Sequence, residues 1–201
     1  MTTIRISDPI DLVKVVPYHM GFHPTRSVVL MGLHRKQLGL IQRLDLPAPA
    51  DAGAAAELLV DNLRREQCTG VVLVVYEQDS GEGDAVADAV LVRLRPARIT
   101  LIEHLVVRAG QVHFAGCTHE IACASVPLPA DDAVPAVAEY VALGRRPVAD
   151  RAALEALLAP EEGPLRARVG AALQRRGALS PLVANRPLAL AEWGRFLDVA
   201  D

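Results

Sequence analysis

The sequence predicts an α/β protein: a layered mixed β-sheet domain with crossover helices, followed by a helical C-terminal appendage. Two short runs, Ser27 to Leu33 and Val71 to Tyr76, are apolar at nearly every position. Such runs are typical of strands that are covered on both faces of a sheet. Helical patterns separate them, which indicates crossover connections. Beyond Pro127 the sequence shows Ala-rich helical patterns and no strand pattern.

The N-terminal part predicts one helix and two strands. Asp8 is suited to cap a short helix, and Pro17 is expected to end it. The strand at Ser27 to Leu33 follows. The next segment, Leu40 to Leu46, alternates between apolar and polar residues, so we expect it to pair with the first strand as a neighbour.

Two histidines, His19 and His23, stand four residues apart before the first strand. This is the spacing of a metal-binding pair on one helical face. Gly21 lies between them and Pro24 follows at once, and both residues interrupt a continuous helix. We therefore interpret the stretch as a turn, in which Gly21 adopts backbone angles closed to other residues and Phe22 plugs the bend.

The middle of the chain alternates helices and strands, with Pro96 expected to stop the second of these helices. The first expected element is a helix from Asp51 to Gln67 with Leu58, Leu59 and Leu63 on its inner face. The central strand, Val71 to Tyr76, follows, and then a helix that carries Val86, Val90 and Leu94. Two strands complete this part, over Ile99 to Arg108 and Val112 to Cys117.

We expect two structural parts. Residues 1–128 are predicted to form the α/β sandwich domain, and residues 129–201 a helical appendage that packs on it. Helical patterns in the second part run over about 131–144, 150–159, 164–176 and 188–199.

Composition excludes several classes of partner. The 201 residues carry a net charge of −3, which predicts no general affinity for nucleic acid or for an anionic membrane. The apolar runs are too short to cross a bilayer, and the N-terminus shows no pattern of a signal peptide. Three cysteines do not resemble a disulfide scaffold. We expect a cytoplasmic protein.

A cluster of soft ligands follows the last predicted strands: His113, Cys117, His119 and Cys123. Zinc prefers such groups. The spacing between the two cysteines is wider than that of the usual zinc knuckle. The interpretations are a surface hairpin with incidental thiols, which we favour, a metal site, and a disulfide or redox pair.

Two loops are candidates for a ligand pocket, residues 21–27 and 78–84. Ligands in open α/β sheets favour the carboxyl ends of strands, where the second loop lies. The candidate binding residues are Gly21, Phe22, Ser27 and Asp79. Gly81 and Gly83 belong to no phosphate-binding pattern, and the acidic residues around them would repel a phosphate. We expect no cofactor.

The segments "ISDPIDLVKVVPYHMGFHPTRSVVLMGL", "RLDLP", "VVLVVY" and "YVALGRRPVADRAALEALLAP" together resemble the actinobacterial domain-of-unknown-function 4192 family. The resemblance covers most of residues 4–160. The family pattern is matched by Asp8, Pro9, Pro17, Gly21, Phe22, Pro24 and Ser27, whereas Val13 replaces a leucine. The family has no established activity, so the resemblance implies no catalytic residue.

Two functions remain, and whether the protein is an enzyme stays open. The favoured one is a non-catalytic interaction or regulatory module, homo-oligomeric or bound to a protein partner through the helical tail, because catalytic signatures are missing. The alternative is a small-molecule-binding domain or enzyme with a pocket near the 21–27 and 78–84 loops.

Overall fold

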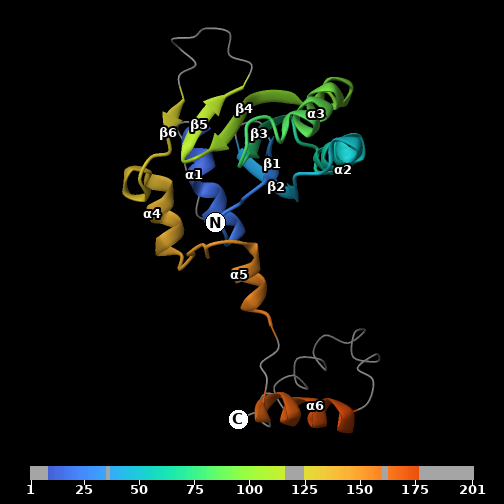
Figure 1. The fold of residues 1–201 in the computed structure, drawn as a ribbon, viewed down its shortest axis with the longest axis vertical. Helices are drawn as coiled ribbons and strands as arrows, with labels where there is room; N and C mark the ends of the chain where they lie inside the picture. Colours follow the sequence, from blue (N-terminus) through green and yellow to red (C-terminus); the bar gives the residue numbers. More distant parts are fainter. Residues whose placement is uncertain (1–8, 35–36, 116–124, 160–162, 177–201) are drawn as a thin grey trace. The chain divides into compact units, whose positions relative to one another are not determined.

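The computed structural model describes residues 9–34, 37–115, 125–159 and 163–176. The chain divides into two compact units, Met1–Leu154 and Glu155–Asp201. The first unit holds a six-stranded mixed sheet in the order β2-β1-β3-β4-β5-β6 (Figure 1). Its strands are β1 (Ser27–His34), β2 (Gln37–Asp45), β3 (Gly70–Tyr76), β4 (Thr100–Arg108), β5 (Gln111–Phe114) and β6 (Val126–Pro127).

The helices complete the α/β fold that the sequence predicts. They are α1 (Pro9–Met20), α2 (Ala52–Arg65), α3 (Asp84–Ala97), α4 (Pro135–Ala142), α5 (Arg151–Ala156) and α6 (Pro164–Arg176), with short 3-10 turns at Pro49–Asp51 and Asp131–Ala133. Strands β3 and β4 are parallel, and every other neighbouring pair of strands is antiparallel. The parallel pair is joined by α3, as a crossover requires. Among the described residues, no helix is both long and apolar enough to span a membrane.

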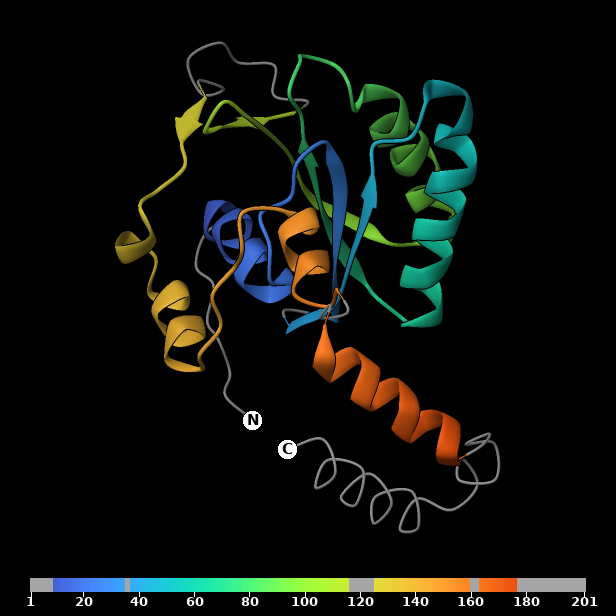
Figure 2. The same cartoon turned by 60° about the horizontal axis from the view of Figure 1, so that its bottom comes forward.

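Helices cover both faces of the sheet. Figure 2 shows α1 on one face and α2 with α3 on the other. Side chains alternate along β3 in the same way, so that Val71 and Leu73 pack under α2 and α3 while Val72 and Val74 pack against α1. All four are fully buried. This two-sided burial explains why β3 is apolar at every position but its first glycine.

Helix α1 continues through Pro17 to Met20, so the prediction that Pro17 ends it is wrong. A proline has no N–H to donate to the carbonyl four residues earlier, which here is that of Val13. The Tyr76 hydroxyl, from β3, donates to that Val13 carbonyl over 3.5 Å. The sheet therefore supplies the hydrogen bond that the helix cannot. Pro96 likewise lies inside α3, one residue before its end.

Replacing Tyr76 by phenylalanine is expected to lower the free energy of unfolding by about 1 kcal/mol, because the buried Val13 carbonyl loses its donor. The measurement is urea unfolding of the variant and the wild type. In the background of Pro17→Ala the same change should cost less, since the alanine restores a backbone N–H for that carbonyl. An equal cost in both backgrounds would contradict this role of Tyr76.

Two further expectations are corrected. Leu58 was expected on the inner face of α2 but is 54% exposed. The buried stripe of this helix runs through Ala56, Leu59 and Leu63, and Leu58 is rotated about 100° from Leu59. Second, the segment beyond Pro127, in which the sequence shows no strand pattern, contains a β-bridge: Val148 pairs in parallel with Phe22.

Helix α4 packs on α1 on the outer side of that layer, as Figure 1 shows. Val15 and Tyr18 of α1 bury against Val137 and Tyr140 of α4. The boundary expected near residue 129 stays a prediction. In the second unit the structure describes the end of α5 and helix α6.

Candidate functional site

The carboxyl ends of the parallel strands β3 and β4 lie together at one end of the sheet. Tyr76, the last residue of β3, pairs with Val107 of β4 and with Ser27 at the start of β1. Ser27 pairs in turn with Asp45, the last residue of β2. We call this region the β3–β4 end. It is where open α/β sheets bind ligands.

The two loops that the sequence singled out meet at the β3–β4 end. A guanidinium nitrogen of Arg26 lies 3.1 Å from Glu82 Oε1, which joins the 21–27 loop to the 78–84 loop. The first loop turns as predicted: Gly21 has a φ of +85°, and Phe22 is buried. His19 Nδ1 lies 3.3 Å from the Tyr140 hydroxyl, and the backbone amide of His23 donates to the Val148 carbonyl.

Glu77 is the most deeply buried charged group of this region, with its side chain only 2% exposed. Its Oε1 accepts a hydrogen bond from the Gly83 amide over 3.0 Å, and its Oε2 accepts one from the Gly81 amide over 3.3 Å. Arg108 donates to Oε2 over 3.1 Å. Gly83 caps the N-terminus of α3, where a helix attracts an anion. The chain's own carboxylate thus accepts the hydrogen bonds of these amides at the N-terminus of α3.

Glu82 closes the tip of the same loop. Its Oε2 accepts hydrogen bonds from the amides of Gln78, over 2.8 Å, and Asp79, over 3.3 Å. The hydrogen bond from the Gln78 amide, together with the Asp79 amide and the charge of Arg26, lowers the pKa of Glu82. Asp79 itself is exposed. The loop amides therefore point at internal carboxylates.

Arg43 of β2 contacts several residues at the other side of the β3–β4 end. Its side chain is only 9% exposed. It donates from Nε to Ser27 Oγ over 2.9 Å, pairs with Asp45, and lies 5.7 Å from the centre of the Phe22 ring. Asp45 also contacts Arg151 over 3.5 Å. The pairing of Arg43 with Asp45 agrees with the alternation of polar residues in β2.

Ser27 is not arranged as a nucleophile. It is fully buried, its hydroxyl donates to the Thr25 carbonyl over 2.5 Å, and it accepts from Arg43. A nucleophilic serine needs a general base within hydrogen-bond reach, and a guanidinium is not one. Within the described part of the chain, these contacts serve to hold the two loops.

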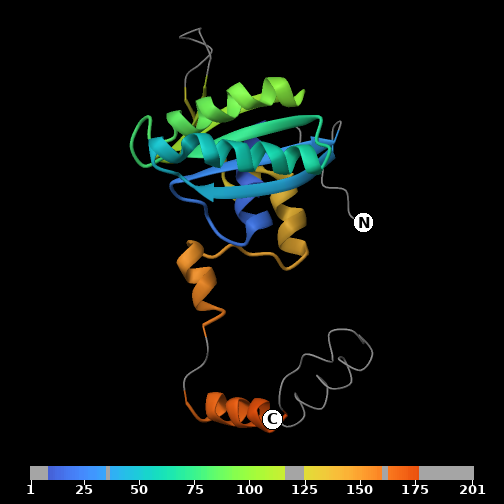
Figure 3. The same cartoon turned by 90° about the vertical axis from the view of Figure 1, so that its right-hand side faces the viewer.

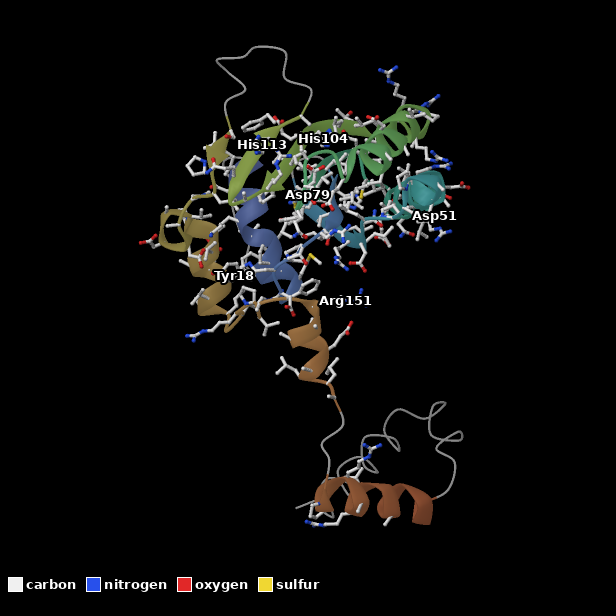
Figure 4. All side chains as sticks on the ribbon, in the orientation of Figure 1. Tyr18, Asp51, Asp79, His104, His113 and Arg151 are labelled. Atoms are coloured by element: carbon white, nitrogen blue, oxygen red, sulfur yellow. The ribbon has the colours of Figure 1, made fainter. Side chains whose placement is uncertain are left out.

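The structure places the four candidate binding residues in two neighbouring loops. Phe22 and Ser27 are brought together through Arg43, Gly21 forms the turn before them, and Asp79 lies in the neighbouring loop (Figure 4). Sequence reasoning missed the part played by Glu77. A signal was present, since an acidic residue directly follows the most apolar strand and precedes two glycines at the start of a helix.

Of the four candidate metal ligands, only His113 lies in the described residues; Cys117, His119 and Cys123 lie outside them. His113 pairs with Val106 of β4, so it lies on the same face of the sheet as His104. Burial lowers the pKa of His104, whose Nε2 is buried without a partner. No three potential metal ligands gather anywhere in the described ranges.

A groove of about 450 Å³ lies between α2 and α3, away from the β3–β4 end. Charged side chains of both signs line it, among them Asp61 and Arg64, which pair over 3.3 Å, and Arg93 from α3. The groove is mixed in character and has no single charge that would select a ligand.

A second polar cluster joins α1 to the 3-10 turn Asp131–Ala133 that precedes α4. Tyr18 donates to Asp131 Oδ2 over 2.5 Å, and Lys14 pairs with Asp131 Oδ1 over 2.5 Å. The hydrogen bond to Asp131, added to burial and the negative charge of that carboxylate, raises the pKa of Tyr18 to about 12. Burial is the main cause that raises the pKa of Tyr76 and of Tyr140.

These three are all the tyrosines of the chain. We expect the tyrosines of the folded protein to ionise at higher pH than those of the urea-unfolded protein, which should ionise near pH 10, the ordinary tyrosine pKa. Because the folded pKa values are raised, their contribution to stability is complete below pH 10 and is lost as the pH rises, for Tyr18 through about 12. Tyrosinate absorbance against pH measures this. The same tyrosinate titration curve in the folded and the urea-unfolded protein would contradict it.

In a comparison with family models, residues 9–195 match a family described as "Domain of unknown function (DUF4192)". No curated protein and no solved structure matches the chain.

Proposed function

The chain belongs to the DUF4192 family, and from that premise we propose that it is a non-catalytic interaction or regulatory module, which works by binding a second copy of itself or another protein. The observation that carries the proposal is the internal pairing at the β3–β4 end. Glu77 accepts from the Gly81 and Gly83 amides, and Arg43 is engaged by Ser27 and Asp45. Groups that an enzyme would turn toward a substrate are here bonded to one another.

Exposed apolar side chains support binding to a protein. Leu157 and Leu158, just after α5, are 71% and 83% exposed. Large apolar side chains gain free energy when a partner buries them. This agrees with a role for the helical tail in recruiting a partner. A cytoplasmic location is part of the same proposal.

A second candidate, a small-molecule-binding domain, draws on the Arg26–Glu82 contact, which brings the 21–27 and 78–84 loops together. A ligand there would have to displace the carboxylates of Glu77 and Glu82 from the loop amides. We therefore rank it second.

Light scattering on the full chain over a wide concentration range tests the first proposal. The expected result is a mass above the 21.5 kDa of one chain, and a mass that rises with concentration. A chain that stays at 21.5 kDa throughout would contradict the proposal in its self-associating form.

A further inference from the structure

Strand β2 is the first strand of the sheet and has a hydrogen-bonded neighbour, β1, on one side only among the described strands. Figure 3 looks onto this edge, with β2 running beneath α2. The Leu46 amide donates to the Arg26 carbonyl, so Leu46 directs its backbone groups toward β1. In an antiparallel pair this direction alternates along the strand. The backbone groups of Ile41 and Arg43 therefore point outward, away from the sheet.

This edge lacks several of the usual protections. Exposed strand edges are normally blunted by lysine, proline or a bulge. The residues of β2 include neither lysine nor proline, and the irregularity in its pairing with β1 lies beyond Ile41, between Met31 and Leu33. The one basic side chain, Arg43, is turned onto Phe22 and neutralised by Asp45 of its own strand. Among the described residues, no strand pairs with the outer edge of the segment from Ile41 to Asp45, which a further strand could join.

The flank of this edge is apolar and symmetric in sequence. Leu40 and Leu44 are half-buried against the α2 layer, and Gln42 lies midway between them with its side chain bonded to the Leu59 carbonyl and to Asn62. Leu58 stands one helical turn before Asn62, on the side of α2 that lies over β2, and is 54% exposed.

We propose that β2 pairs antiparallel with β2 of a second copy of this chain, about a two-fold axis at Gln42. In this register Ile41 of one copy and Arg43 of the other exchange two backbone hydrogen bonds, and the symmetric pair does the same. Leu40 then lies directly opposite Leu44 of the other copy. The pairing continues the sheet across the axis. It rests on the proposed function, and it names a second copy as the partner and the edge of β2 as the surface.

The axis at Gln42 gives better side-chain pairs between the two copies than an axis at either neighbouring residue. An axis at Arg43 would place two arginines directly opposite each other, which is destabilising. An axis at Ile41 would place Leu40 opposite Gln42 and lose the leucine pairs. Each of these three axes pairs the outward backbone groups, and among the three the axis at Gln42 places Leu40 opposite Leu44. It also brings the two copies of Leu58 to the same interface.

Amide hydrogen exchange on the full-length protein tests the pairing without any mutation. The amides of Ile41 and Arg43 are expected to become protected as the protein concentration rises, whereas those of Gln42 and Leu44, which face β1, are protected at every concentration. Fast exchange of Ile41 and Arg43 at concentrations where the protein is dimeric would overturn the proposal.

Matched variants test the flank. Leu58→Glu is expected to weaken dimerisation by roughly a hundredfold, because each dimer loses two buried leucines. Val92→Glu, an equivalent change at a side chain of α3 that is 69% exposed, should leave dimerisation unchanged. Ile41→Pro removes an outward N–H that the monomer does not use, and should also abolish the dimer. If this variant does not fold, the hydrogen-exchange experiment on the unmodified protein tests the β2 pairing instead.

Two outcomes separate this proposal from the proposed function. A dimer that survives Leu58→Glu but is lost on joint Leu157→Ser and Leu158→Ser substitution would overturn the β2 pairing and leave the interaction module standing. A wild-type chain that is monomeric throughout, with fast-exchanging Ile41 and Arg43 amides, would overturn both self-association and the β2 pairing.

Discussion

Replacing Glu77 by alanine is expected to lower the free energy of unfolding by about 3–5 kcal/mol, the cost of breaking a buried ion pair from one side. The change removes the acceptor of the Gly81 and Gly83 amides and leaves Arg108 without its partner. Urea unfolding followed by circular dichroism measures the loss.

Two controls accompany this variant. Asp79→Ala removes an exposed carboxylate from the same loop and should change stability by no more than about 0.5 kcal/mol. With Arg108→Ala already in place, the further cost of Glu77→Ala should be smaller, because the two side chains are coupled. If Glu77→Ala proves as mild as Asp79→Ala, Glu77 does not hold the β3–β4 end together.

Gly83→Ala is expected to destabilise the fold by about 3 kcal/mol, at the upper end of the overpacking range. A Cβ at this position would lie 2.2 Å from Val75 Cγ1 in β3. The backbone of Gly83 has a φ of −99°, which alanine adopts freely, so the cost comes from the contact alone. Thermal and urea unfolding check the value.

The partner of that contact provides the test of its cause. Val75→Ala by itself opens a cavity and should cost about 2 kcal/mol. The double variant should cost at least about 1 kcal/mol less than the sum of the two, because the added methyl group enters the space that the valine leaves. Gly53→Ala, whose Cβ would meet only Arg93 at 3.7 Å, should be neutral or stabilising. Strict additivity of Gly83→Ala and Val75→Ala would contradict the contact.

Most elements could be predicted from the sequence where burial alone decides the structure. Strands β1 and β3 follow from unbroken apolar runs, and α3 from Val86, Val90 and Leu94, all of which are buried. Pro17 was misinterpreted because its helix is completed by Tyr76, which lies 63 positions beyond the Val13 carbonyl it serves and which local patterns do not reveal. The β-bridge of Val148 with Phe22 was missed for the same reason.

The candidate site was predicted only in outline. The sequence indicated which two loops border the carboxyl end of the central strand, and Arg26 with Glu82 joins those loops. The part of Glu77 depends on the distance between a side chain and two amides four and six residues later, and on Arg108 from another strand. No periodicity encodes such a distance. The exposure of Leu58, a single step around α2 from Leu59, is equally a product of packing.

The chain's own carboxylates, Glu77 and Glu82, accept the hydrogen bonds of the loop amides at the end of the sheet where open α/β sheets bind ligands, and the proposed function rests on this internal pairing. A titration of the labelled protein with inorganic phosphate, followed by the NMR signals of the Gly81 and Gly83 amides, tests it most directly. The expected result is no saturable shift of either signal. A saturable shift of both, at millimolar phosphate or below, would contradict it.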